Sequence, residues 1–158
     1  MLNVLFLDTG NTTESLIAES VLRACGQGRF RAWSAGCLPD SGASPRVLEF
    51  LRERDLPVEG LRSKGLRELV GPEGPSFAFV IALSELAAGA CAERTFRGDP
   101  VVAQWHLDTE EENEPSVWAL RDSYWILSRR IKIFTSLPHG TASRHSLQRR
   151  LQALQSWQ

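Results

Sequence analysis

Three features that would assign the chain to a special class of protein are missing or scarce. None of its 158 residues belongs to an apolar run approaching the roughly 20 residues that a membrane helix needs. No basic region precedes the first apolar run, so we expect no signal peptide. Only three cysteines are present, an odd number without metal-ligand spacing, which favours a cytoplasmic location and no disulfide framework.

A strong charge of either sign is also absent. The net charge of −1 provides no overall attraction to nucleic acid, and we expect neither nucleic acid nor membrane as a partner. The distribution is uneven, because residues 138–158 contain Arg144, Arg149 and Arg150 but no acid. We interpret these arginines as a solvated helix face or a frayed tail, with a nucleic-acid or partner-binding arm as the alternative.

Short apolar runs alternate with helix-like segments along most of the chain, which predicts a parallel sheet covered on both faces by helices. We expect one domain over residues 1–137, followed by a basic extension over 138–158 that is helical or partly disordered. The predicted strands are 3–7, 29–34, 77–83 and 100–105. The predicted helices are 14–25, 45–54, 63–70 and 116–134, with further helical turns within 84–94 and 143–157.

Five tryptophans are many for this length, and Trp118, Trp125 and Trp157 lie in the C-terminal region. We expect them to pack in the core, with a protein interface as the alternative.

The loop after the first strand, residues 8–15, reads DTGNTTES and is the predicted site. Ligands of open α/β sheets bind beyond the carboxyl ends of the strands. The backbone N–H groups at the start of the next helix suit an anion there. Two residues of the loop, Asp8 and Glu14, are acids and oppose an anion. The other candidate members of the cradle are Thr9, Gly10, Asn11, Thr12, Thr13 and Ser15.

The order of strand, x-T-G-N-x-x-x-S and helix resembles the low-molecular-weight protein tyrosine phosphatases and the thioredoxin-coupled arsenate reductases. The resemblance continues in FRAWSAG (30–36), GLRSK (60–64), FAFVI (77–81) and AQW (103–105), and it spans residues 3–136. It implies a flavodoxin-like three-layer α/β sandwich, phosphotyrosine phosphatase I-like, with a four-stranded parallel sheet. It implies no cofactor and no metal.

The resemblance places a nucleophilic cysteine where Asp8 stands and an oxyanion-binding arginine where Glu14 stands. A carboxylate cannot replace the thiolate without an acid catalyst and usually Mg²⁺. A unit-charge pair at about 4 Å contributes roughly 4 kcal/mol at an effective dielectric of 20, so replacing arginine by glutamate turns an attraction of that size into a repulsion. We therefore expect weak or no oxyanion binding and a binding or regulatory role. The expected partner is a second copy or an unknown protein.

The family's general acid is an aspartate after the last strand. Asp108 occupies that position if one residue is deleted, and otherwise is a plain loop carboxylate. The arsenate reductases also use two cysteines after the central strand. Ser84 stands at the first of these positions, and Cys91 has no resolving partner. We expect Asn11 to brace the loop and Ser15 to bond Asp8.

Several alternatives for the two acids stay open. Asp8, Glu14 and Asp108 could act as oxygen ligands for Mg²⁺ or Ca²⁺ in a metal-dependent phosphohydrolase, or the chain could be a still-active relative of the family. Glu14 could point outward as a first-turn acid of the helix. Asp8 and Glu14 could also accept the loop's own N–H bonds. Two further motifs fit poorly: an actin-like kinase needs a longer chain, and a haloacid-dehalogenase-type phosphatase needs an aspartate where Gly10 stands.

Overall fold

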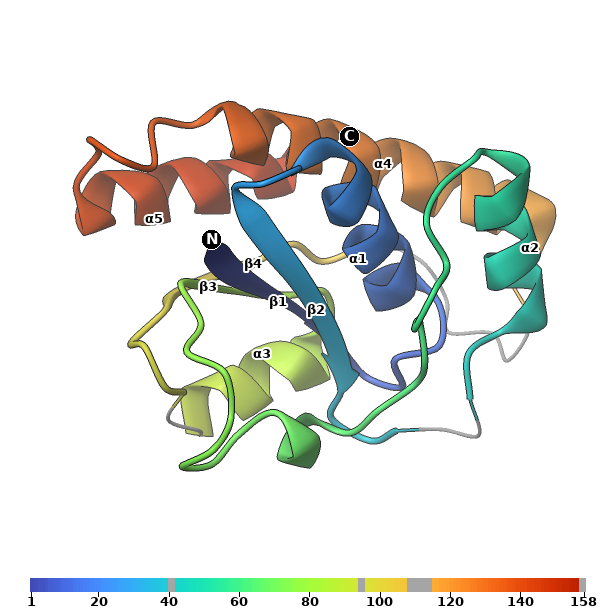
Figure 1. Cartoon of the computed structure of the whole chain (residues 1–158), viewed down its shortest axis with the longest axis horizontal. Helices are drawn as coiled ribbons and strands as arrows, with labels where there is room; N and C mark the ends of the chain where they lie inside the picture. Colours follow the sequence, from blue (N-terminus) through green and yellow to red (C-terminus); the bar gives the residue numbers. More distant parts are fainter. Residues whose placement is uncertain (40–41, 94–95, 108–114, 157–158) are drawn as a thin grey trace.

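A four-stranded parallel sheet forms the centre of the computed structural model, which describes residues 1–39, 42–93, 96–107 and 115–156 (Figure 1). The strand order is β2-β1-β3-β4. Pairing is in register, with Val4 opposite Ala32 on one side and Phe79 on the other. The strands are β1 (Leu2–Asp8), β2 (Phe30–Gly36), β3 (Phe79–Ala82) and β4 (Val101–Gln104).

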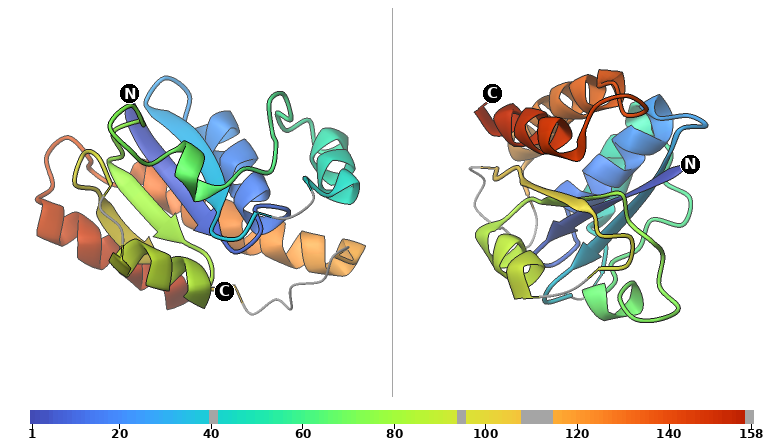
Figure 2. Two further views of the ribbon diagram at one scale, coloured as in Figure 1. Left: turned by 90° about the horizontal axis from the view of Figure 1, so that it is seen from below. Right: turned by 90° about the vertical axis from the view of Figure 1, so that its left-hand side faces the viewer.

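Helices cover both faces of this sheet, so the predicted three-layer, flavodoxin-like architecture is confirmed (Figure 2). One face carries α1 (Glu14–Cys25), α2 (Pro45–Glu53), α4 (Val117–Ser136) and α5 (Arg144–Ala153). The other carries α3 (Glu85–Glu93) and the 3-10 turn η1 (Leu66–Glu68). A second 3-10 turn, η2 (Leu154–Ser156), follows α5.

Strand β1 shows why the sheet is buried on both sides. Val4 and Phe6 pack into the core under α1 and α4, whereas Leu5 and Leu7 pack into the core under α3. Successive side chains of a strand point to opposite faces. An unbroken apolar run is therefore the pattern that a doubly covered parallel strand requires.

Helix α4 buries one stripe and exposes the opposite one. Its buried stripe contains Leu120, Leu127, Ile131 and Phe134. Trp118 is 72% exposed and Trp125 is 60% exposed. The expectation of core packing is therefore wrong for these two residues. They lie seven positions apart, on the side of the helix opposite the stripe. Trp105, by contrast, is fully buried.

The helix predicted over 63–70 is also wrong, because only the single turn η1 forms there. Gly65 pairs with Gly36 in a parallel bridge, and the Gly36 N–H donates to the carbonyl of Lys64 at 2.9 Å. This pairing with the end of β2 holds the chain extended until Leu66.

Helix α5 lies along the free edge of β4 (Figure 1). The Gln152 side chain accepts the Gln104 N–H at 2.9 Å and donates to the Gln104 carbonyl at 3.1 Å. The Trp105 indole N–H donates to the Leu151 carbonyl at 2.8 Å. The two bonds to Gln104 satisfy main-chain groups that an edge strand otherwise leaves open.

Along the described ranges, no helix combines the length and apolarity needed to cross a membrane.

Gly36 is the position where the end of β2 approaches the loop after β1 most closely. A Cβ atom there would lie 2.8 Å from the Gly10 carbonyl carbon and 2.9 Å from the Asn11 nitrogen. We expect Gly36→Ala to lower the free energy of unfolding by about 1–3 kcal/mol, because rigid backbone must move. Urea unfolding followed by circular dichroism measures this.

Gly89→Ala is the matched control. No atom lies within 4 Å of its added Cβ, and the residue is inside α3. This change should raise stability by about 0.5–1 kcal/mol, since alanine is the better helix former. Equal effects of the two changes would contradict the close approach at Gly36.

Candidate functional site

The loop over residues 8–15 joins the carboxyl end of the central strand β1 to the start of α1. Both neighbouring strands contact it at this edge. The Cys37 N–H donates to the Asp8 carbonyl at 3.0 Å, and the Leu38 N–H donates to the Thr9 carbonyl at 2.8 Å. On the other side, the Leu83 N–H donates to the Leu7 carbonyl at 2.8 Å. The loop therefore lies between the ends of β2 and β3.

The Asp8 side chain points into this loop and is only 6% exposed. Its Oδ1 accepts the Asn11 N–H at 2.6 Å, and its Oδ2 accepts the Ser15 N–H at 3.1 Å. The Ser15 hydroxyl also favours the ionised form of the Asp8 carboxyl and lowers its pKa. The first acid of the loop is thus bound by donors of the loop itself.

Asn11 holds the loop in shape. Its backbone has a φ of +56°, a left-handed conformation that asparagine tolerates better than most residues. Its Nδ2 donates to the Ser15 Oγ at 2.7 Å, and its Oδ1 accepts the Lys64 N–H at 2.8 Å. The side chain therefore joins the loop to a segment 53 residues away along the sequence.

Three serines that are distant in the sequence also form hydrogen bonds with the loop, and this role was not predicted from the sequence. The Ser63 hydroxyl donates to the Gly10 carbonyl at 3.0 Å. The Thr9 hydroxyl donates to Ser84 Oγ at 3.1 Å, and this oxygen also accepts the Ala87 N–H in the first turn of α3. The Ser44 N–H donates to the Thr12 carbonyl at 3.3 Å. The sequence signal that could have revealed the role of Ser63 is GLRSK (60–64), a segment that resembles the phosphatase family.

Thr13 is buried and is the N-cap residue of α1, but its side chain makes no capping hydrogen bond. Its carbonyl accepts the Ile17 N–H at 3.0 Å. Thr13 therefore contributes to the start of the helix through its backbone.

The pKa of the Asp8 carboxyl is raised from 3.8 to about 7, mainly by burial. The Ser15 hydroxyl bond lowers it, the nearby negative charge of Glu14 raises it, and the N–H groups of Asn11 and Ser15 lower it. Donors that favour the carboxylate therefore offset only part of the cost of removing it from water. Asp8 titrates close to neutral pH.

Glu14 is the first residue of α1, and the structure brings it close enough to Asp8 for the two charges to interact. Asp108, the candidate general acid, lies outside the described residues. Within the part of the chain that the structure describes, no group of three His, Cys, Asp or Glu side chains is arranged to hold a metal ion.

A buried ionic cluster lies behind the loop and positions Lys64. Glu19 is 2% exposed, accepts the Ser34 hydroxyl at 2.7 Å and pairs with Arg23. The Lys64 ammonium lies 3.9 Å from Glu19 and donates to the Ser34 carbonyl at 2.8 Å. Burial lowers the pKa of Lys64, and the Glu19 charge opposes this shift. This cluster fixes the backbone whose N–H reaches Asn11.

The thiols of Cys25 and Cys91 do not supply a nucleophile. Burial raises the pKa of Cys91 to about 12, with Cys37 nearby adding to the effect. Burial also raises the pKa of Cys25. The thiolate is the reactive form of cysteine, and Cys25 and Cys91 are protonated at neutral pH.

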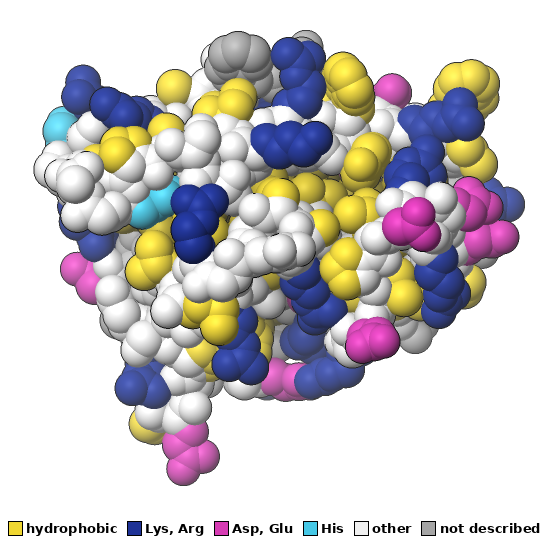
Figure 3. All heavy atoms as spheres, turned by 45° about the horizontal axis from the view of Figure 1, so that its top comes forward, with side chains coloured by type: hydrophobic (Ala, Val, Ile, Leu, Met, Phe, Trp, Pro, Cys, Tyr) yellow, Lys and Arg dark blue, Asp and Glu magenta, His cyan; other side chains and the backbone are white. Residues whose placement is uncertain are grey.

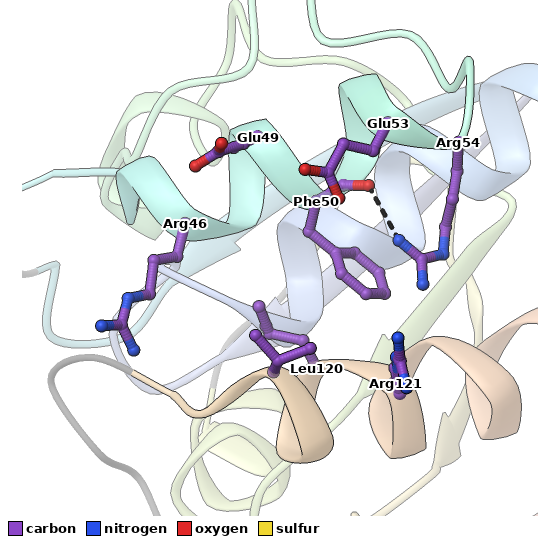
Figure 4. A pocket seen from close by; sticks show the side chains of 8 residues that line it. Arg46, Glu49, Phe50, Glu53, Arg54, Leu120 and Arg121 are labelled. Atoms are coloured by element: carbon purple, nitrogen blue, oxygen red, sulfur yellow. Dashed lines mark hydrogen bonds between the residues drawn. The ribbon is translucent and has the colours of Figure 1, made fainter.

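A cavity of about 360 Å³ lies between α2 and α4 and was not predicted (Figure 4). Phe50 and Leu120 provide apolar walls, and the Arg54 guanidinium lies 3.5 Å from the centre of the Phe50 ring. The charged side chains that line the cavity are of both signs, arginine and glutamate, and they surround these apolar side chains. The remaining lining residues are Arg46, Glu49, Glu53, Val117 and Arg121.

Comparison with known proteins gives one family. The model of low molecular weight phosphotyrosine protein phosphatases matches residues 3–115. Among curated proteins, none matches the chain.

Solved structures share the fold at low sequence identity. A low molecular weight protein tyrosine phosphatase from T. tengcongensis is 23% identical with a TM-score of 0.69, over 87% of this chain and 100% of that one. The YwlE arginine phosphatase from Geobacillus stearothermophilus is 20% identical with a TM-score of 0.68, over 85% and 91%. A thioredoxin-dependent arsenate reductase from Corynebacterium glutamicum is 23% identical with a TM-score of 0.64, over 84% of this chain, which spans only 59% of that chain.

The raised pKa of Asp8 predicts a pH-dependent stability. The unfolded carboxyl ionises near 3.8 and the folded one at about 7, so the folded state binds the proton more tightly. The free energy of unfolding should therefore fall as pH rises from 3.8 to about 7, by about 1.4 kcal/mol per unit from this group. The ¹³C shift of the Asp8 carboxyl, followed by NMR, should titrate near pH 7.

Three variants separate the causes of the raised pKa of Asp8. Glu14→Gln removes a negative charge and should lower the Asp8 pKa, whereas Glu53→Gln on α2 should leave it unchanged. Asp8→Asn cannot titrate and should abolish this part of the pH slope. Titration of Asp8 near pH 4 in the unaltered protein would refute the account.

Proposed function

Because the chain belongs to the low molecular weight phosphotyrosine protein phosphatase family, we propose that it keeps the family's loop as a scaffold and lacks the family's catalytic chemistry. Its role is then to bind or regulate a partner. The observation that supports this most directly is the Asp8 carboxylate, which accepts the N–H groups of Asn11 and Ser15. These two N–H groups, which would otherwise face a bound anion, donate instead to a carboxylate of the chain itself.

An internal carboxylate supplies acceptors for the N–H groups of the loop. Buried N–H groups without acceptors are costly, at about 1–3 kcal/mol each. Asp8 satisfies two of them, and its partial negative charge lies at the N-terminus of α1, where the helix dipole favours it. The scaffold is thereby complete in the absence of phosphate.

The same acids oppose an incoming oxyanion. Asp8 is buried, and the charge of Glu14 acts on the same site. The Glu14 charge raises the pKa of Asp8, and both acids repel a dianion when they are ionised. A carboxylate also lacks the nucleophilicity of a thiolate, and Cys25 and Cys91 are held protonated. These groups support loss of both oxyanion binding and attack on phosphorus.

A divergent metal-dependent phosphohydrolase is the competing function. It would use Asp8 with Glu14 and Asp108 as oxygen ligands. Both oxygens of Asp8 already accept backbone N–H bonds, and a cradle of N–H donors offers no acceptor to a cation. These bonds favour the non-catalytic proposal over the metal-dependent one.

We expect the purified protein to show no turnover of an aryl phosphate, and no reduction of arsenate in the presence of thioredoxin and its reductase. Initial-rate assays at pH 5–8 measure both. An active family member assayed in parallel provides the control. Turnover at the control's rate, abolished by Asp8→Ala, would reject the proposal and establish a still-active relative.

The double change Asp8→Cys with Glu14→Arg tests whether the scaffold is intact. It removes the internal carboxylate and reverses the charge of the second acid, so phosphate or sulfate should bind at least about ten-fold more tightly than to the unaltered protein, a gain of about 1.4 kcal/mol. Calorimetric titration with each anion measures this. Failure of both anions to bind would mean that the loop has a different shape from a functional cradle.

Titration with Mg²⁺ distinguishes the competing function. We expect no heat of binding for the unaltered protein and none for Asp8→Asn. Binding that is present in the unaltered protein and lost in Asp8→Asn would favour the metal-dependent enzyme.

A further inference from the structure

The cavity between α2 and α4 contains none of the loop residues 8–15. Its volume of about 360 Å³ lies at the small end of the roughly 300–1,000 Å³ that is typical of ligand pockets. The space therefore suits one small molecule, and not a folded segment of another protein.

The walls of this cavity offer apolar surface to a ligand. Phe50 and Leu120 are 5% and 1% exposed, so they form a fixed base that belongs to the core. Val117, the first residue of α4, also lines the cavity and is 53% exposed. An apolar group that enters the cavity would cover Val117, and removing such surface from water favours binding.

Two guanidinium groups lie at one end of the cavity, one from each helix (Figure 4). Arg54 of α2 donates to the Phe50 carbonyl at 3.2 Å and reaches α4, where it lies 5.5 Å from the Tyr124 ring centre. Arg121 lies three positions before Tyr124 on α4, one helical turn away. Guanidinium groups donate paired hydrogen bonds to a carboxylate, so this end of the cavity suits an anionic group.

Two acids, Glu49 and Glu53, line the same cavity from α2. Among the residues that the structure describes, neither acid forms an ion pair with Arg54 or Arg121. At the right of Figure 3, on the side that α2 and the first turns of α4 form in Figure 1, side chains of both signs surround hydrophobic ones. Both signs of charge are thus open to a ligand.

We propose that this cavity binds a free α-amino acid with a large apolar side chain, such as phenylalanine. Arg54 and Arg121 hold its carboxylate, Glu53 holds its ammonium group, and its side chain lies against the apolar walls. The two charged groups of an amino acid are bonded to one carbon atom, and Glu53 and Arg54 are likewise neighbours on the protein.

The charges of the lining favour a free amino acid over other small ligands. A simple anion would be repelled by the two glutamates, and a simple cation by the arginines. The C-terminal residue of a peptide has no free ammonium group, and its N-terminal residue has no free carboxylate. A free amino acid carries both charges and so matches both.

Amino-acid binding is independent of the proposed loss of catalysis, because the cavity and the loop over 8–15 share no residue. Its measurement requires no phosphatase or arsenate reductase assay. Failure of either proposal therefore leaves the other standing.

Titration of the ¹⁵N-labelled full chain with L-phenylalanine, followed by NMR, tests the proposal. Amide signals of the α2 and α4 residues around the cavity should shift and saturate, with a Kd on the order of 0.1–1 mM for so small a ligand. The absence of saturable shifts up to about 10 mM, or shifts confined to other parts of the chain, would overturn it.

Analogues test each part of the ligand. L-Phenylalaninamide lacks the carboxylate, N-acetyl-L-phenylalanine lacks the ammonium group and L-alanine lacks the ring. Each should bind at least about ten-fold more weakly than L-phenylalanine. Equal binding of N-acetyl-L-phenylalanine would make the cavity a site for anions in general, and equal binding of L-alanine would show that the apolar walls contribute nothing. Either result rejects the proposal.

Variants assign the charged groups of the cavity. Arg121→Gln and Glu53→Gln should each weaken the binding of L-phenylalanine by at least about ten-fold. Glu53→Gln should also remove the preference for L-phenylalanine over its N-acetyl form, whereas Arg121→Gln should keep that preference. All of these side chains are exposed, and circular dichroism checks that the variants stay folded. Arg149→Gln on the exposed side of α5 is the control and should leave binding unchanged. Unchanged binding in both cavity variants would contradict the proposal.

Discussion

Two backbone N–H groups, those of Asn11 and Ser15, hold the buried carboxylate of Asp8, and the shape of the site depends on this interaction. It places a negative group at the carboxyl end of the central strand and the start of α1. Burial and the charge of Glu14 make that group titrate at about pH 7. The bonding of the loop and its response to pH thus share one cause, on which the proposed loss of oxyanion binding also rests.

The loop keeps its form because contacts from three distant segments surround it. Asn11 bridges Ser15 and Lys64, and Lys64 is held in turn by a buried cluster that includes Glu19 and Ser34. Gly36 permits the end of β2 to lie against the loop backbone without a clash. Buried polar networks of this kind fix one conformation when each member has a partner. The proposed persistence of the scaffold without the family's catalytic chemistry rests on this network.

The two sides of α4 differ in burial and in composition. Its inner stripe of leucine, isoleucine and phenylalanine closes the core, and its outer face carries two exposed tryptophans. Core packing does not require the outer pair, which lies exposed on the side of α4 opposite the buried stripe.

The sequence by itself determined the layered sheet and the position of the loop, because apolar runs and helical spacing report local geometry directly. It also identified Asp8 and Glu14 as replacements within a family pattern. It did not predict the exposure of Trp118 and Trp125, which it assigned to the core. Only the tertiary structure decided which N–H groups Asp8 accepts, and that residues 63–65 run extended beside Gly36 instead of starting a helix. Such bonds join residues as far apart in the sequence as Leu7 and Leu83, and no local pattern encodes which distant groups the packing brings together.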